Sequence, residues 1–565
     1  MVEAVRPKRK SPYPLWFFLP AAVIYGVFFL LPTATSFWYS LTRWDLMTAE
    51  FIGLENFHQF FSEPFLVQGL INTLIYAAMT SGLKTVFGLL LAVLLTSNLI
   101  ARGFLRTVVF FPVLVSTIGI GITFTVMMHP TRGIINVALE ATGIDGPGWL
   151  TDPALALFSV ALVDLWKGVG LATLIFIAGL AAISPDYYEA SRIDGATRMQ
   201  QFRRITLPLV QPATITVITL SLIGGLRSFD LIWAMTRGGP GFSSDGVGNL
   251  QTVSGRVLRA FDRRQCHPLC PDRRDHGAVD RHVQSPGDRS MRRYRPIVVG
   301  GISLAIAAVI FIVPFLFIAL QAVKSRSEAS RLNFLLPKEW LLWDNLVAVV
   351  EARNYQLLLA YFNSTVITVF SVTILVVLSA MVGYVMQRRR SRWNGVVQVA
   401  VLIGLMMPPA VVPTIGLLQS IGLFKTMSGM VLIQVAYNLS FSTLLYRSFI
   451  GTIPRDLDEA ALIDGAKPWQ IFFRVVMPLL KPVTVTNIVV QSIAIFNDFT
   501  NPLYYLPGKE NVTVQLTLYN FQSMYSSQYN LLFMNILLVT IPPLIVFIFF
   551  NRQIVAGMTA GGVKG

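Results

Sequence analysis

A polar segment occurs twice in this chain, and the two copies constrain its architecture more than any other feature. The first copy spans residues 183–208 and the second spans residues 453–478, at a constant offset of 270 residues. The matched positions include Glu189 and Glu459, Ala190 and Ala460, Ile193-Asp194-Gly195-Ala196 and Ile463-Asp464-Gly465-Ala466, Arg204 and Arg474, and Pro208 and Pro478. A long-range repeat of this kind predicts two related halves, each with one polar segment between apolar helices.

The composition places these halves in a lipid bilayer. Of the 565 residues, 54% are hydrophobic and 13% are charged, and the mean hydropathy is +0.61, whereas soluble domains carry about 25% charged residues. The net charge of +16 does not indicate a nucleic-acid partner, because the basic residues fall in short loops where they set membrane orientation. The two cysteines, Cys266 and Cys270, are too few for a disulfide framework. We therefore expect an all-α integral membrane protein.

The lengths of the apolar stretches predict about 11 transmembrane helices, since about 20 apolar residues cross the hydrocarbon core. In the first half, residues 1–240, the predicted spans are 15–38, 70–96, 104–128, 154–182 and 208–234. In the second half, residues 291–565, they are 296–322, 361–386, 395–420, 428–450, 482–499 and 531–550. The first apolar run is too long for the core of a signal peptide. With the basic N-terminus inside, both polar segments fall on the cytoplasmic face.

Residues 241–290 break this pattern. The fifth span leaves the chain outside, whereas Arg292, Arg293 and Arg295 place the start of the second half inside, and no apolar stretch in 241–290 supplies the missing crossing. We interpret this Arg/His-rich junction as mainly an out-of-frame translation that replaced a sixth span and fused two chains. The alternatives are a disordered charged linker and a zinc site. The spacing from Cys270 to His276 is shorter than a zinc finger requires.

The repeated segment resembles the EAA loop of the membrane subunits of bacterial ABC importers, and the resemblance covers nearly the whole chain except about residues 245–290. Gly238-Gly239-Pro240 and the tail 557–565 resemble the carbohydrate branch, the maltose-transporter-like permeases. The resemblance implies two permease halves joined in one chain of the cytoplasmic (inner) membrane, which import a sugar or related polyol. It also implies two kinds of partner, a dimer of ABC ATPase subunits that uses the ATP and an extracytoplasmic solute-binding protein.

In that family the EAA loop docks into a cleft of the ATPase subunit. The resemblance assigns this coupling role to Glu189, Ala190, Gly195, Glu459, Ala460 and Gly465. Asp186 and Asp456 stand near the expected helix starts, where a negative charge meets the positive end of the helix dipole, and a glycine suits a turn with positive φ. An ordinary cytoplasmic loop capped by charges is the alternative, and two matched copies on one face favour coupling.

Polar residues inside the predicted spans are the candidates for the substrate path, because such groups are costly in hydrocarbon. With the resemblance to maltose-type permeases, which use the stretch before Gly238 for sugar, the candidates are Leu226, Arg227, Asp230, Trp233, Asn438, Asn497 and Asp498. Two alternatives remain: Arg227 pairs with Asp230 on one helical face, or Asn438 and Asn497 join helices by hydrogen bonds. For Asp164 and Lys167 in the fourth span we expect a local ion pair.

Nothing in the sequence indicates an enzyme. The chain has no Walker A motif and no evident nucleophile–base pair, so we expect no catalytic residues, and neither a cofactor nor a metal bound by this chain. An ion-coupled secondary transporter is the alternative function, since such proteins also show internal repeats and broken helices. Neither that class nor a channel or receptor has a reason to carry two EAA-like loops on the cytoplasmic face.

Overall fold

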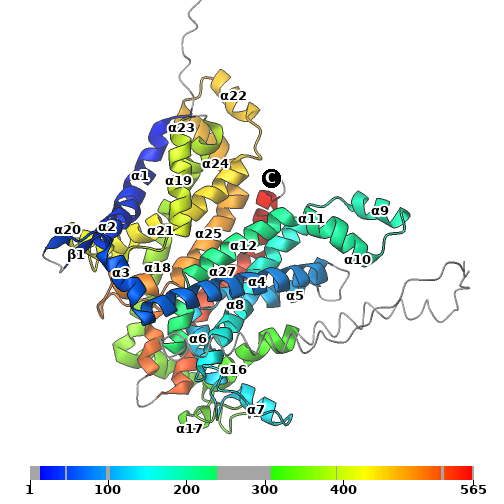
Figure 1. Ribbon diagram of the computed structural model, residues 1–565, viewed down its shortest axis with the longest axis vertical. Coiled ribbons are helices and arrows are strands. Elements are labelled where there is room, and N and C mark those ends of the chain that lie inside the picture. The colour runs from blue at the N-terminus through cyan, green and yellow to red at the C-terminus, as the bar shows by residue number, and fades with distance from the viewer. Residues whose placement is uncertain are drawn as a thin grey trace, which may run out of the picture.

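The computed structural model describes residues 13–44, 48–96, 102–237, 307–389, 391–522 and 527–562. Within these ranges the molecule is a bundle of helices with one small antiparallel hairpin, formed by β1 (Thr42–Trp44) and β2 (Ala49–Phe51) (Figure 1). The junction 241–290, both cysteines and Gly238-Gly239-Pro240 lie outside the described residues, so their interpretation stays a prediction.

The described helices match ten of the eleven predicted spans, and the all-α membrane fold is confirmed. Six spans are continuous and four are pairs of helices bent at a break. The predicted span 296–322 is described only from residue 307, as the shorter apolar helix Val309–Ala322. The continuous spans are η1–α2 (Leu15–Ser40), α4 (Pro64–Thr96), α8 (Pro153–Ala181), α18 (Leu342–Arg388), α21 (Met427–Ile450) and α27 (Tyr529–Gly562). Residues 352–355 in α18 have non-helical φ/ψ, so the predicted span 361–386 is the second part of this helix.

Two predicted spans, 104–128 and 395–420, are sharply bent rather than straight. In the first half, α5 (Arg102–Phe110) and η3 (Phe111–Leu114) meet α6 (Thr117–Met127) at 99°, and in the second, α19 (Trp393–Met406) meets α20 (Val411–Ser420) at 111°. Pro408 and Pro409 fill the second break, where a proline removes an amide donor and clashes with the preceding turn. Each half therefore has a broken span at the same place in its order of helices.

Two further bends lie where the polar segments enter the membrane. They join α10–α11 (Arg198–Leu209) to α12 (Gln211–Leu226) at 64°, and α23–α24 (Pro468–Leu479) to α25 (Lys481–Phe496) at 76°. Pro212 and Pro482 stand at the start of the second helix of each pair, where no amide donor is lost. The predicted spans 208–234 and 482–499 end early, and each is followed by a short helix, α13 (Asp230–Thr236) or α26 (Thr500–Tyr505).

The first span of each half packs against the other half. In η1–α2, Phe17, Tyr25 and Phe29 belong to the core formed with α18 and α21, and the Tyr25 hydroxyl donates to the carbonyl of Ala400 at 2.7 Å. In return, the indole of Trp166 in α8 donates to the carbonyl of Ile310, just before α16 (Val313–Ala322), at 2.7 Å. The two halves are thus interlocked rather than side by side.

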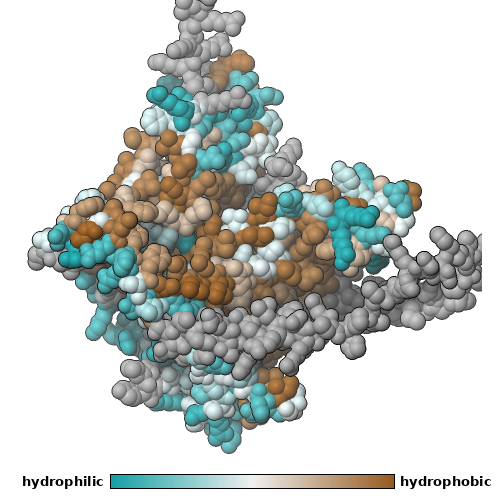
Figure 2. Space-filling view, in the orientation of Figure 1, coloured by the Kyte–Doolittle hydropathy of each residue, from teal (hydrophilic) through white to brown (hydrophobic). Residues whose placement is uncertain are grey.

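The two ends of the bundle differ in polarity from its middle. Figure 1 places α9, α10, α22 and the end of α27 toward the upper and right-hand edges, whereas α3 (Glu55–Ser62), α7 (Ile134–Glu140) and α17 (Arg326–Ala329) lie toward the lower and left-hand edges. In Figure 2 hydrophobic residues cover the middle, and hydrophilic residues gather over α9–α10 and at the upper and lower ends. This is the surface of a protein that spans a bilayer with both polar segments on one side.

Candidate functional site

Each polar segment folds as two short helices joined at its glycine. The first consists of α9 (Pro185–Ile193) and α10 (Arg198–Gln201), and the second of α22 (Asp456–Ile463) and α23 (Pro468–Gln470). Gly195 and Gly465 have φ of +76° and +79°, a left-handed conformation that favours glycine. Asp186 and Asp456 lie in the first turn of α9 and α22, as the sequence predicts. The local geometry of the repeat is therefore the same in both halves.

The residues that were assigned to coupling are on the surface of both segments. Glu189, Ala190 and Gly195, and their equivalents Glu459, Ala460 and Gly465, are all exposed. Beside them, the side chains of Ile193 and Ile463 are 87% and 86% exposed. Two apolar side chains this exposed, at the same position of a repeat and outside the membrane, indicate a pair of equivalent contact surfaces.

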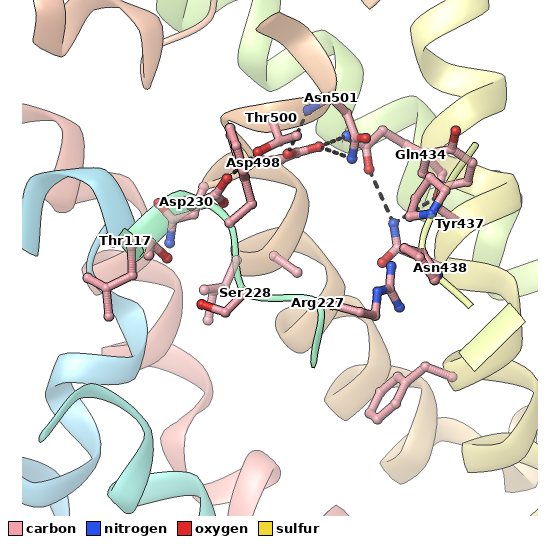
Figure 3. Close-up of a pocket in the computed structure, with 18 of the residues that line it drawn as sticks. Thr117, Arg227, Ser228, Asp230, Gln434, Tyr437, Asn438, Asp498, Thr500 and Asn501 are labelled. Carbon is pink, nitrogen blue, oxygen red and sulfur yellow. Dashed lines mark hydrogen bonds between the residues drawn. The ribbon is translucent and has the colours of Figure 1, made fainter. Parts of the chain in front are cut away.

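A polar cavity of about 640 Å³ lies between the two halves (Figure 3). Its wall includes the break that follows η3, the prolines between α19 and α20, and the breaks after α12 and α25. Discontinuous helices of this kind leave backbone and polar side chains free to line a cavity within a membrane. The two sharply bent spans and the ends of α12 and α25 therefore converge on one site from both repeats.

The axis that relates the two halves passes through this cavity. Thr500 donates a hydrogen bond to a carboxylate oxygen of Asp230, and these two residues are 270 positions apart, the offset of the repeat. Equivalent residues that touch each other lie on a two-fold axis. Figure 3 shows the two loops, residues 227–230 and 498–501, facing each other at this point.

Five of the seven candidate residues for the substrate path line the cavity, namely Arg227, Asp230, Asn438, Asn497 and Asp498. Leu226 and Trp233 do not; Trp233 is 40% exposed and stacks on Phe229 with ring centroids 5.8 Å apart. The short helices α13 and α26 begin just after the breaks. Arg227, Asn497 and Asp498 lie in these breaks and line the cavity.

The alternative in which Arg227 pairs with Asp230 is not observed. Arg227 reaches across to the second half, where its Nη1 donates to the carbonyl of Leu405 at 3.3 Å. Asp230 accepts from Thr500 instead. The hydrogen-bonding alternative holds in part: Asn497 Nδ2 donates to the carbonyl of Leu114 in the first half at 2.8 Å.

The expected local ion pair between Asp164 and Lys167 is wrong. Asp164 Oδ2 lies 2.6 Å from the Nζ of Lys84 in α4, and Lys167 donates to Thr117. Lys84 comes from α4 and Asp164 from α8, so the packing of α4 against α8, rather than spacing along α8, determines the pair.

Sequence reasoning missed several cavity residues. Asp498 accepts from Gln434 in α21 and from the side chain of Asn501 at 2.7 Å, and it was predicted without these partners. An uncharged amide such as Gln434 in an apolar span is a weak signal, since it serves equally well to join helices. The repeat would have located Thr500, because it is the equivalent of the predicted residue Asp230.

Comparisons with known proteins agree with this geometry. The family model for the binding-protein-dependent transport system inner membrane component matches residues 84–326 and again 375–559. The trehalose/maltose transport system permease protein MalF of Thermococcus litoralis is 36% identical over 231 residues, covering 40% of this chain and 78% of the relative. The arabinooligosaccharides transport system permease protein AraP of Bacillus subtilis is 34% identical over 225 residues, covering 40% and 71%.

Among solved structures, the chain is similar to one chain of a bacterial ABC transporter involved in the import of the acidic polysaccharide alginate. The identity is 20%, the TM-score is 0.41, and the match covers 48% of this chain and 98% of that chain. The family model matches this chain twice, and MalF and AraP each match only 40% of it, so the chain holds two units of the same kind.

Proposed function

Since the chain belongs to the family of binding-protein-dependent transport system inner membrane components, we propose that it supplies both membrane halves of an ABC importer for a sugar or polyol, with its polar segments as the coupling elements. It is an ABC importer permease of the carbohydrate type and a multi-pass protein of the inner membrane. The family transports rather than catalyses, and in this proposal ATP is hydrolysed by separate subunits.

The observation that carries the coupling proposal is the pair of matched polar segments on one side of the molecule. Glu189 and Glu459 are exposed there, next to Ile193 and Ile463, whose side chains have almost no contact with the rest of the chain. A dimer of ATPase subunits presents two equivalent clefts, and two equivalent segments fit them. ATP binding would close the dimer and shift the membrane halves between two conformations, to the extent that the dimer binds them with different free energies.

The cavity between the halves is the proposed substrate site. Its volume of about 640 Å³ lies within the range of about 300–1,000 Å³ that is usual for small-molecule sites. Sugar hydroxyls both donate and accept hydrogen bonds, and the wall offers carboxylates, amides and the guanidinium of Arg227. The names of the relatives MalF and AraP specify trehalose, maltose and arabinooligosaccharides, so these sugars are the first to be tested.

Uptake of radiolabelled maltose, trehalose and arabinooligosaccharides tests the proposal, in cells that produce the chain with its ATPase subunit and its solute-binding protein. We expect uptake to require all three components. Glu189→Ala and Glu459→Ala should each reduce uptake while the amount of chain in the membrane stays the same. Glu140→Ala is the matched control, because Glu140 is an equally exposed glutamate at the end of α7 on the opposite side.

An ion-coupled secondary transporter gives a different result in the same cells. Uptake that persists without the ATPase subunit and collapses when an uncoupler removes the ion gradient would refute the importer proposal. Normal uptake in both glutamate variants would leave the transporter class standing and refute the coupling role of the segments.

A further inference from the structure

We call the two polar segments, residues 183–208 and 453–478, the first and second coupling segments. An ion pair is buried beneath the second coupling segment. Nε of Arg388, at the end of α18, lies 2.9 Å from Oδ2 of Asp458 in the first turn of α22, and the two side chains are 2% and 1% exposed. The same guanidinium donates from Nη2 to the carbonyl of Ile453 at 3.0 Å. Arg388 therefore holds both the helix and the chain that leads into it. A buried ion pair is by itself weak evidence for stability, but removing one partner leaves an unpaired buried charge, so the position of α22 depends on both residues.

The pair also reaches the first half of the chain. The hydroxyl of Tyr13 lies 3.4 Å from Asp458 Oδ2 and donates to it. Arg389 donates to the carbonyl of Tyr13 at 2.6 Å, and the Tyr13 ring meets the edge of Tyr384 with centroids 5.5 Å apart. The residue just before the first span is thus fixed to α18 and to the second coupling segment.

An aromatic cluster supports the ion pair from the membrane side. Phe472, in the π-helix η7 (Ile471–Val476) of the second segment, is fully buried. Its ring lies 5.2 Å from that of Phe17 and 5.3 Å from that of Tyr384, centroid to centroid. Because closely packed side chains transmit displacement, a movement of the segment reaches both η1 and α18.

Among the described residues, the first coupling segment has no equivalent of the Arg388–Asp458 ion pair; residues 97–101, which follow α4, lie outside the described ranges. The repeat places Tyr188 at the position of Asp458, and its hydroxyl shares a hydrogen bond of 2.9 Å with Thr206 of the same segment. A cavity of about 400 Å³ lies between part of this segment and the ends of α4 and α8, and Phe202, the equivalent of Phe472, packs against the core that α4 and α8 form. Across the part of the chain that the structure describes, residues 183–208 form no ion pair. The two segments are alike in shape and different in how they are attached.

We propose that Arg388 and Asp458 are positioning residues that transmit the movement of the second coupling segment to α18 and, through Tyr13, to the first span of the chain. This inference rests on the proposed coupling to an ATPase. In the core, α18 packs with α21, which carries Gln434 and Asn438 of the cavity wall. The route from the second segment to the substrate site therefore runs through α18 and α21.

The charge of Asp458 depends on the charge of Arg388. Burial raises the pKa of the Asp458 carboxyl, and the guanidinium of Arg388 opposes this shift. A buried charge without its partner is strongly unfavourable. Removing either residue leaves the other as a buried charge without a partner. The second coupling segment must then move so that water can solvate that charge.

The test compares uptake with ATP hydrolysis in membranes that contain the chain, its ATPase subunit and its solute-binding protein. In Asp458→Asn and in Arg388→Gln we expect the ratio of substrate transported to ATP hydrolysed to fall by about fivefold or more, the lower range of typical coupling between sites. The double variant should be no worse than either single variant, because both residues act through one contact. Tyr13→Phe, which removes only one hydroxyl, should lower the ratio less.

Two controls separate this role from a general structural one. Asp344→Asn removes an exposed carboxylate from the first turn of α18, at the other end of the helix that carries Arg388 and outside both coupling segments, so the ratio should stay unchanged. Tyr188→Phe, at the matching position of the first segment, should also leave it unchanged. A purely structural role would instead lower uptake and ATP hydrolysis together, in proportion to the chain in the membrane.

An unchanged ratio in Asp458→Asn at a normal level of chain overturns the proposal, and so do additive effects in the double variant. If the single variants do not accumulate in the membrane, the double variant and Tyr13→Phe are each compared with the unmodified chain. An unchanged ratio of substrate transported to ATP hydrolysed in both variants also overturns the proposal. A failure of the proposed function is distinct from these outcomes, because the unmodified chain would then transport substrate without the ATPase subunit.

Discussion

Replacing Lys84 by methionine should destabilise the first half of the molecule. The Nζ of Lys84 in α4 lies 2.6 Å from Oδ2 of Asp164 in α8, and the side chains are 11% and 18% exposed. Methionine keeps an unbranched apolar stem and removes the charge. Two unit charges about 4 Å apart attract by about 4 kcal/mol at an effective dielectric constant near 20. Breaking a buried pair by removing one partner costs about 3–5 kcal/mol.

The expected loss for Lys84→Met is about 3 kcal/mol in the free energy of unfolding, the lower end of that range, because Asp164 also borders the polar cavity. The assay is a denaturant titration of the purified chain in mixed micelles, followed by tryptophan fluorescence. The double variant Lys84→Met with Asp164→Leu removes both charges and should recover most of the loss. Lys509→Met, at an exposed lysine, is the control and should stay within about 0.5 kcal/mol of the unmodified chain.

The result that refutes this reasoning is a double variant no more stable than Lys84→Met. The cost would then come from the shape of the replaced side chain and not from an unpaired carboxylate. A loss below about 1 kcal/mol in the single variant would show that water in the cavity already solvates Asp164, as it does for exposed pairs.

Three further substitutions test other parts of the site. Arg227→Ala removes the guanidinium that crosses the cavity and should raise the KM of sugar uptake about tenfold, the effect of one charged hydrogen bond; an unchanged KM would contradict its place in the path. Thr500→Val leaves Asp230 without its donor and should lower the free energy of unfolding by about 1–3 kcal/mol in the same titration, whereas no change would exclude a stabilising contact at the axis. Gly465→Ala strains a left-handed residue by about 1–2 kcal/mol and should impair ATPase coupling. Gly143→Ala, with φ of +81° on the opposite side, should spare coupling, and equal effects would argue against a specific turn.

Features that depend on neighbours in the sequence could be predicted. The apolar stretches located ten spans, and the glycines at 195 and 465 located the turns in the two coupling segments, because positive φ at a glycine is a local property. The breaks within spans 104–128 and 395–420 were missed. The pair Pro408-Pro409 was a local signal for the second break, whereas the first break has one proline, Pro112, which also occurs in intact membrane helices.

Features that depend on packing could not be predicted. Lys84 is 80 residues from Asp164, and Arg388 is 70 residues from Asp458, so no spacing along a helix relates the members of either pair. The position of the first span on the opposite half has the same origin, since an apolar helix carries no mark of the helix it will pack against. These contacts decide how the coupling segments are attached, which is why the difference between the two segments is visible only in the structure.

The cavity combines a symmetric backbone with asymmetric chemistry. Both repeats place a break and a short helix at the same positions, but the side chains there differ. In the alignment of the two repeats, Arg227 corresponds to Asn497, Ser228 to Asp498, and Asp230 to Thr500. A symmetric backbone lets both halves move about one axis, whereas a symmetric set of charges would bind a sugar equally well in two orientations. Because the guanidinium comes from one half only, we expect a substrate with two different ends to bind in one direction. We infer that this asymmetry reflects a division of roles between two halves that remain alike in fold.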